Sequence, residues 1–184
     1  MRENKKFELE LLKGGYKDIH YNYDSRHPFP TPFKVTLDGV VLGQIKGGKP
    51  TGYQYPDYRW EPLHLLMTAD TIMDRDLCGF SFFNGALTLR ITPVNDKVTI
   101  SLEKDDINPK FANYNPNDIR PVEADLEDVA FEFYKAYNDV ALDVSQYDAA
   151  SLLKFLKDNS VDFFSQDRVK ALFRKHKVPM VCLS

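Results

Sequence analysis

Apolar and polar residues alternate along much of the first 108 residues, a pattern typical of half-buried β-strands. Asp38-Gly39 and Asn84-Gly85 are residue pairs that favour two-residue hairpin turns, so the flanking strands are expected to pair antiparallel. The expected strands are Phe7–Leu11, Ile19–Tyr23, Phe33–Leu37, Val40–Leu42, Gly79–Phe83, Leu87–Ile91 and Val98–Leu102.

Two stretches among these strands do not follow the alternating pattern. Residues 43–62 are rich in Gly, Pro and Tyr and predict a long loop, and residues 110–121 predict a polar loop. Leu63–Met73 has apolar residues that suit a short helix, although the pattern leaves helix and strand both open.

The period of the apolar residues changes from two to 3.6 after residue 121, which predicts helices. Asp125 is a suitable N-cap, and the stretch from Leu126 to Val144 predicts a long amphipathic helix. A second helix is expected from Asp148 to the polar residues 158–160, and a third from about Ser165.

Strands followed by helices indicate an α+β fold. We expect one domain over residues 1–184, mainly β over 1–108 and helical over 122–178. The simplest arrangement is a twisted antiparallel sheet packed by the long helix, with the last two helices forming a C-terminal hairpin.

Composition favours a cytoplasmic globular domain. The chain has 43% hydrophobic and 28% charged residues, and it shows neither a signal peptide nor an apolar run that could span a membrane. The two cysteines, Cys78 and Cys182, form neither a disulfide framework nor a zinc cluster, and Cys78 is interpreted as a core residue. The net charge of −3 argues against nucleic acid as the partner.

No motif in the sequence predicts a catalytic group, a cofactor or a metal site. Gly43–Pro50 resembles a phosphate-binding loop, but proline stands where the magnesium-binding hydroxyl should be. Asp158, Ser160 and Asp162 have the opening spacing of a calcium loop that lacks its later ligands. The four histidines show no metal-ligand spacing.

Two features indicate a binding surface. The first is an aromatic segment within the 43–62 loop, because Tyr, Trp and Arg are common at interface hot spots. The second is charge segregation, with acids on the long helix and bases on the third helix, which either neutralise each other or steer a partner. The predicted partner-binding residues are Tyr53, Tyr55, Tyr58, Arg59, Trp60, Glu127, Asp128 and Glu132.

Three functions follow from these features. The favoured one is a non-catalytic protein-binding domain with an acidic face and a basic protein partner, one form of which is an immunity-type protein that neutralises a toxin. The alternative is a small hydrolase-like enzyme with its site in residues 43–78, where His64, Asp74, Asp76 and Tyr58 would have to converge. The weakest is a nucleic-acid binder that uses the basic last helix. In a purely structural interpretation, Asp74 and Asp76 form a charged turn with Arg75 as their counter-ion.

Overall fold

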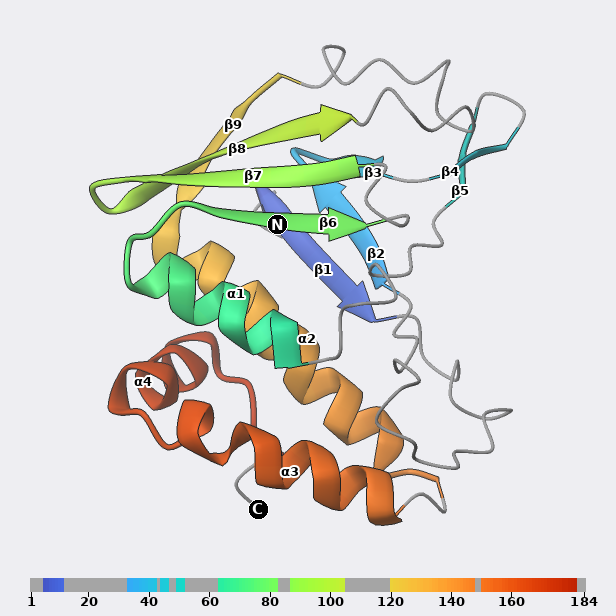
Figure 1. Ribbon diagram of the computed structural model, residues 1–184, viewed down its shortest axis with the longest axis vertical. Coiled ribbons are helices and arrows are strands. Elements are labelled where there is room, and N and C mark those ends of the chain that lie inside the picture. The colour runs from blue at the N-terminus through green and yellow to red at the C-terminus, as the bar shows by residue number, and fades with distance from the viewer. Residues whose placement is uncertain are drawn as a thin grey trace.

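The computed structural model arranges strands and helices around one apolar core (Figure 1). It describes residues 5–11, 33–42, 44–46, 49–51, 63–82, 87–104, 120–147 and 150–181. The strands are β1 (Phe7–Leu11), β2 (Phe33–Leu37), β3 (Val40–Leu42), β4 (Gln44–Lys46), β5 (Lys49–Thr51), β6 (Cys78–Phe82), β7 (Leu87–Val94), β8 (Lys97–Lys104) and β9 (Val122–Asp125). The helices are α1 (Leu63–Met73), α2 (Leu126–Val144), α3 (Ala150–Phe164) and α4 (Asp167–His176).

The first sheet has the order β1-β2-β3 and is antiparallel throughout. The turn between β2 and β3 has positive φ at both central residues, 47° at Asp38 and 80° at Gly39. This is the requirement of a type I′ hairpin, and it explains why the Asp-Gly pair stands there. Gln44–Lys46 and Lys49–Thr51 form a separate two-stranded antiparallel pair within the segment that the sequence predicts to be a loop.

The second sheet has the order β6-β7-β8-β9 and one polar face. Leu87, Leu89 and Ile91 are buried, whereas the alternate residues Arg90 and Thr92 are exposed. The strand β9 was not expected: it pairs with β8 and occupies the first residues of the part predicted to be helical, directly after the predicted polar loop 110–121. It is only four residues long, too short for its alternation to be recognised next to proline-rich neighbours.

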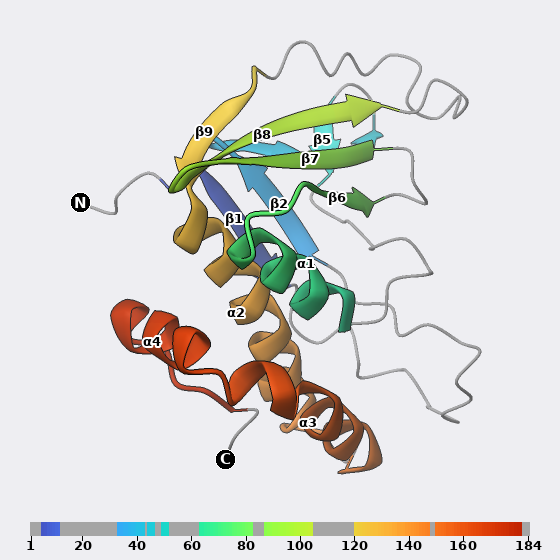
Figure 2. The same ribbon diagram turned by 60° about the vertical axis from the view of Figure 1, so that its left-hand side comes forward.

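Helix α2 begins where β9 ends. The carboxylate of its N-cap, Asp125, accepts hydrogen bonds from the backbone N–H groups of Glu127 and Asp128 at 3.1 and 3.3 Å, which satisfies two donors that the helix leaves free. Figure 2 shows that α2 lies between the sheets and the C-terminal helices α3 and α4, with α1 beside it. For this reason its buried surface extends beyond one stripe and includes the polar residues Glu132, Asn138 and Asp143.

The C-terminal helices differ from the sequence expectation at one boundary. Helix α3 continues through residues 158–160 to Phe164 instead of ending there. Asn159 donates to the carbonyl of Phe155 at 2.8 Å and Ser160 to that of Lys157 at 3.1 Å, so their side chains bond back to their own helix and do not end it. The connector to α4 is therefore only two residues long, Ser165 and Gln166.

The α+β class is confirmed. Leu63–Met73 is a helix, and no helix in the described ranges is long and apolar enough to cross a membrane. The expected strand Ile19–Tyr23 and the turn Asn84-Gly85 lie outside the described residues, although Phe82 opposite Leu87 shows that β6 and β7 pair as that turn predicts.

Candidate functional site

The predicted partner-binding residues fall into three groups. The aromatic residues Tyr53, Tyr55, Tyr58, Arg59 and Trp60 lie outside the described residues. Glu127 and Asp128 are exposed on the first turn of α2. Glu132, one turn further along, is 3% exposed.

The exposed pair Glu127 and Asp128 is engaged by α4. The ammonium group of Lys175 lies 2.9 Å from the Glu127 carboxylate and 3.5 Å from that of Asp128. This hydrogen bond to Glu127 raises the pKa of Lys175. The acidic face and the basic helix therefore neutralise each other at this point. This is the first of the two alternatives that the charge segregation allows, the other being the steering of a partner.

His176 lies beside the same pair, and packing explains its position. Its ring stacks on Phe131 with 3.9 Å between ring centroids, and its Nε2 lies 3.4 Å from Asp128. Burial lowers the pKa of His176, so the neutral ring is favoured. Stacking on Phe131 therefore accounts for the position of His176.

Glu132 does not belong to an exposed acidic face, and its inclusion there was wrong. One carboxylate oxygen accepts a hydrogen bond from the backbone N–H of Leu9 at 3.2 Å, and the other lies 2.5 Å from the ammonium of Lys5. Because β1 is the edge strand of its sheet, that N–H would otherwise be an unpaired buried donor. Glu132 therefore fixes β1 to α2.

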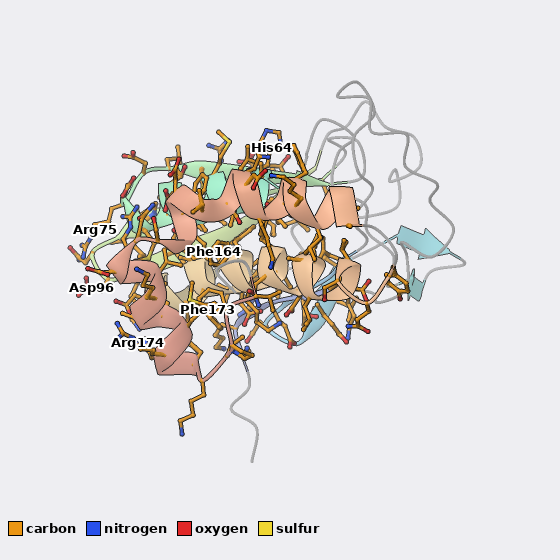
Figure 3. The ribbon with its side chains drawn as sticks, turned by 90° about the horizontal axis from the view of Figure 1, so that it is seen from below. His64, Arg75, Asp96, Phe164, Phe173 and Arg174 are labelled. Carbon is orange, nitrogen blue, oxygen red and sulfur yellow. The ribbon has the colours of Figure 1, made fainter. Side chains whose placement is uncertain are left out.

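The described part of the hydrolase hypothesis does not converge. His64 lies in the first turn of α1 and Asp74 follows its last residue, which separates them by about 15 Å along the helix. Figure 3 shows His64 and Arg75, the neighbour of Asp74, well apart. Arg75 also does not serve as counter-ion to its neighbours, because it lies 2.6 Å from Asp96 in the β7–β8 turn.

The carboxylates of α1 take part instead in a polar network that joins three helices. Asp70 accepts hydrogen bonds from the Tyr134 hydroxyl on α2, from Arg168 on α4 at 3.0 Å and from Gln166 at 3.3 Å. Arg168 also donates to Asp74 at 2.5 Å. Burial, reinforced by Asp70, raises the pKa of Tyr134 far above its usual range. Tyr134 therefore stays protonated, and its hydroxyl and the Asp70 carboxylate serve to join the helices.

Three of the basic residues of α4 contact acidic side chains of the protein. Arg168 and Lys175 make the contacts described above, and Lys170 lies 3.7 Å from Asp167. This engagement weakens the nucleic-acid hypothesis, since phosphate binding needs basic side chains that are available to it.

Cys78 at the start of β6 is half-buried against the core. Burial raises the pKa of its thiol from 9.0 to about 11, so the group is a poor nucleophile at neutral pH. Its position agrees with the interpretation of Cys78 as a packing residue.

A cleft, which we call the β1–α2 cleft, is the candidate site. It has a volume of about 320 Å³, at the lower end of the range for small-ligand sites. The end of β1 forms one wall and the second half of α2 the other. Its lining residues are Glu10, Leu11, Lys135, Asp139, Leu142, Asp143 and Gln146.

The α2 wall of this cleft is one helical face, because its residues are spaced by about one turn. Lys135 contacts Asp139 at 2.7 Å, and across the cleft Glu10 contacts Lys34 of β2 at 2.7 Å. Leu142 is 39% exposed on this otherwise polar face. The cleft thus combines an accessible apolar side chain with three carboxylates and one ammonium in its lining.

The charge balance of the cleft is reflected in Lys135. Burial opposes its charged form, but the hydrogen bond to Asp139 and the charges of Asp139, Glu132 and Glu8 outweigh burial and raise the pKa of Lys135. Sequence reasoning identified neither this cleft nor the Asp70 network. The available signal for the cleft was weak: acids at 139 and 143 beside Leu142 on one helical face.

Within the residues that the structure describes, no group of three or more potential ligands could hold a metal ion. Comparison with known proteins gives no further guide: no family model matches the chain, and neither the curated proteins nor the solved structures include a significant match.

Proposed function

We propose that the protein is a non-catalytic protein-binding domain whose partner docks over the β1–α2 cleft. The observation that carries this proposal is the composition of the cleft, where the exposed Leu142 stands among Glu10, Asp139 and Asp143. Interfaces are held by side chains that fill such pockets, surrounded by polar groups that exclude water.

The proposed function still uses an acidic binding face, as predicted from the sequence, but that face lies at the β1–α2 cleft and not on the first turns of α2. Glu127 and Asp128 are paired with α4, and Glu132 is buried. Glu10 and Asp139 are each paired with a lysine as well, but they line the β1–α2 cleft. A toxin-neutralising protein of the immunity type is one form of this function, in which the partner is a toxin whose basic surface is covered.

Photo-crosslinking tests the proposal directly. A benzoylphenylalanine placed at Gln146, which is exposed on the cleft rim, should yield one discrete adduct with a protein partner in extracts of the native source. The same residue placed at the exposed Asp162 of α3 serves as the matched control. Identical adducts at both positions, or none at Gln146, would contradict a partner surface at the cleft.

A toxin-neutralising function of the immunity type requires a second experiment. The partner identified through Gln146 should be toxic when expressed alone and harmless when co-expressed with this protein. A partner that is harmless alone would rule out this form and leave the binding function in place.

A further inference from the structure

We infer that the surface of α2 around Asn138 is a binding site for an extended peptide segment, and that residues 178–181, which follow α4, occupy it as an exchangeable intramolecular ligand. A second segment with the same backbone pattern and similar apolar side chains competes with residues 178–181 for this site. The inference concerns a different part of α2 from the β1–α2 cleft, so it does not depend on the partner proposed there.

The side-chain amide of Asn138 binds backbone groups on both of its sides. Its Nδ2 donates to the carbonyl of Pro179 at 3.1 Å, and its Oδ1 accepts from the N–H of Val181 at 2.7 Å. A residue of a parallel β-strand likewise pairs with a carbonyl and an N–H that lie two residues apart on its neighbour. Asn138 therefore imitates one residue of a strand, and these two bonds read the backbone of the occupant, as in peptide recognition by strand addition.

The burial of Asn138 means that the site requires an occupant. Its side chain is 1% exposed, and a buried amide that loses its partners carries the full cost of its desolvation. Any segment that presents a carbonyl and, two residues later, an N–H can satisfy both atoms. Replacement of one segment by another therefore conserves the hydrogen bonds of Asn138, and the apolar contacts decide which segment is bound.

The resident segment shows what kind of ligand fits. Val178, Met180 and Val181 are partly buried against the core, whereas Pro179 is exposed, so none of the four residues is fully buried. Proline fixes its own φ and biases the residue before it towards an extended conformation. Lys177, with a left-handed φ of 56°, turns the chain from α4 back towards α2. The ligand class is thus an extended segment with apolar side chains and a free N–H at the position of Val181.

Hydrogen exchange of the wild-type full chain tests whether the resident segment opens. If it is exchangeable, the Val181 amide exchanges through local opening, at least about tenfold faster than the Val140 amide in α2 and with little dependence on urea. Equal exchange rates and equal urea dependence for the two amides would mean that the segment leaves only on global unfolding, and the inference would then be wrong.

An NMR titration tests whether another segment can take its place. The probe is the blocked peptide acetyl-Lys-Val-Pro-Met-Val-N-methylamide, which has the sequence of residues 177–181. The receptor is the ¹⁵N-labelled full chain with Val181→Pro, which removes the N–H donor of the resident segment. We expect saturable shifts of the Asn138 side-chain amide, and binding at least about tenfold tighter than to the wild type, because the competitor has lost a buried hydrogen bond.

A second peptide and a matched pair of variants identify the contact. The peptide with N-methylvaline in the last position lacks the donor to Asn138 and should bind at least about tenfold more weakly. In the Val181→Pro chain, Asn138→Leu should abolish binding of the first peptide. Asn159→Leu should not, because the Asn159 amide is exposed on α3 and bonds to its own helix. Urea denaturation establishes that each variant is folded before it is titrated.

Three results would overturn the inference: no shift at Asn138 in the folded Val181→Pro chain, equal binding of the two peptides, or binding that survives Asn138→Leu. Shifts confined to the cleft residues Asp139 and Leu142 would also overturn it, since the peptide would then occupy the other site. Should Val181→Pro fail to fold, titration of the wild type decides instead. There the first peptide should displace the resident segment and shift the Val181 amide, and the N-methylated peptide should not.

Discussion

The carboxylate of Glu132 is the buried group whose removal tests the packing of β1 most directly. It is 3% exposed, and its two partners are the Leu9 N–H at 3.2 Å and the Lys5 ammonium at 2.5 Å. We expect Glu132→Ala to lower the free energy of unfolding by about 2–3 kcal/mol, and Glu132→Gln by about 1 kcal/mol.

The magnitude follows from the separate contributions. An unsatisfied buried N–H at Leu9 costs about 1–3 kcal/mol, and the one buried methylene that is lost costs about 0.8 kcal/mol. Relief of carboxylate desolvation offsets part of this loss. Lys5, at 48% exposed, regains water when its partner is removed and adds little. Glutamine keeps the methylenes and an oxygen that can accept from Leu9, which explains its smaller effect.

Urea denaturation measures both variants, with Glu123→Ala on β9 as an exposed acidic control that should change stability by less than about 0.5 kcal/mol. Hydrogen exchange of the Leu9 amide provides a local readout, because its protection should fall in Glu132→Ala more than in Glu132→Gln. If alanine proves no more destabilising than glutamine, the hydrogen bond to Leu9 does not hold β1 and this reasoning is refuted.

Three further predictions concern the helical part and the thiol. Arg168→Ala should cost about 1–3 kcal/mol in thermal or urea unfolding, since it leaves the Asp70 carboxylate without its cation, whereas Lys170→Ala should cost less than about 0.5 kcal/mol. Lys175→Ala should change stability by less than about 1 kcal/mol, and that small change should shrink at 1 M salt, because its ion pairs are about half exposed. The folded state raises the pKa of the Cys78 thiol from 9.0 to about 11, so it stabilises the protonated form: this contribution is complete below pH 9 and is lost as the pH rises through 11. The urea midpoint of the wild type should therefore fall more steeply over that interval than that of Cys78→Ala, and parallel curves would contradict it.

Much of the helical part could be predicted from the sequence, because its signals are local. Asp125 is an N-cap in both sequence and structure, and Leu126–Val144 follows at the expected boundaries. The end of α3 could not be predicted in this way. Polar residues at 158–160 commonly mark a helix end, but here the side chains of Asn159 and Ser160 bond to carbonyl groups of the preceding turn and Ser160 is buried.

The site residues were harder to predict because burial depends on contacts between distant segments. Helical periodicity places Glu132 opposite the apolar stripe, as if one side of α2 faced solvent. The sequence pattern does not indicate that β1 covers that side and that Lys5 supplies the counter-ion. The cleft has the same origin, since Glu10 and Asp139 line one cavity only because β1 packs on α2.

The buried polar residues of α2 explain why the cleft lies near the end of this helix. Glu132 binds the β1 edge, and Asn138 donates to the Pro179 carbonyl at 3.1 Å and accepts from the Val181 N–H at 2.7 Å. Each of these side chains anchors a backbone segment that lies against α2. Beyond them, the face that carries Asp139, Leu142 and Gln146 borders a cavity instead. Among the described residues, the end of α2 that carries Leu142 therefore faces this cavity, whereas the middle of the helix is held by backbone segments.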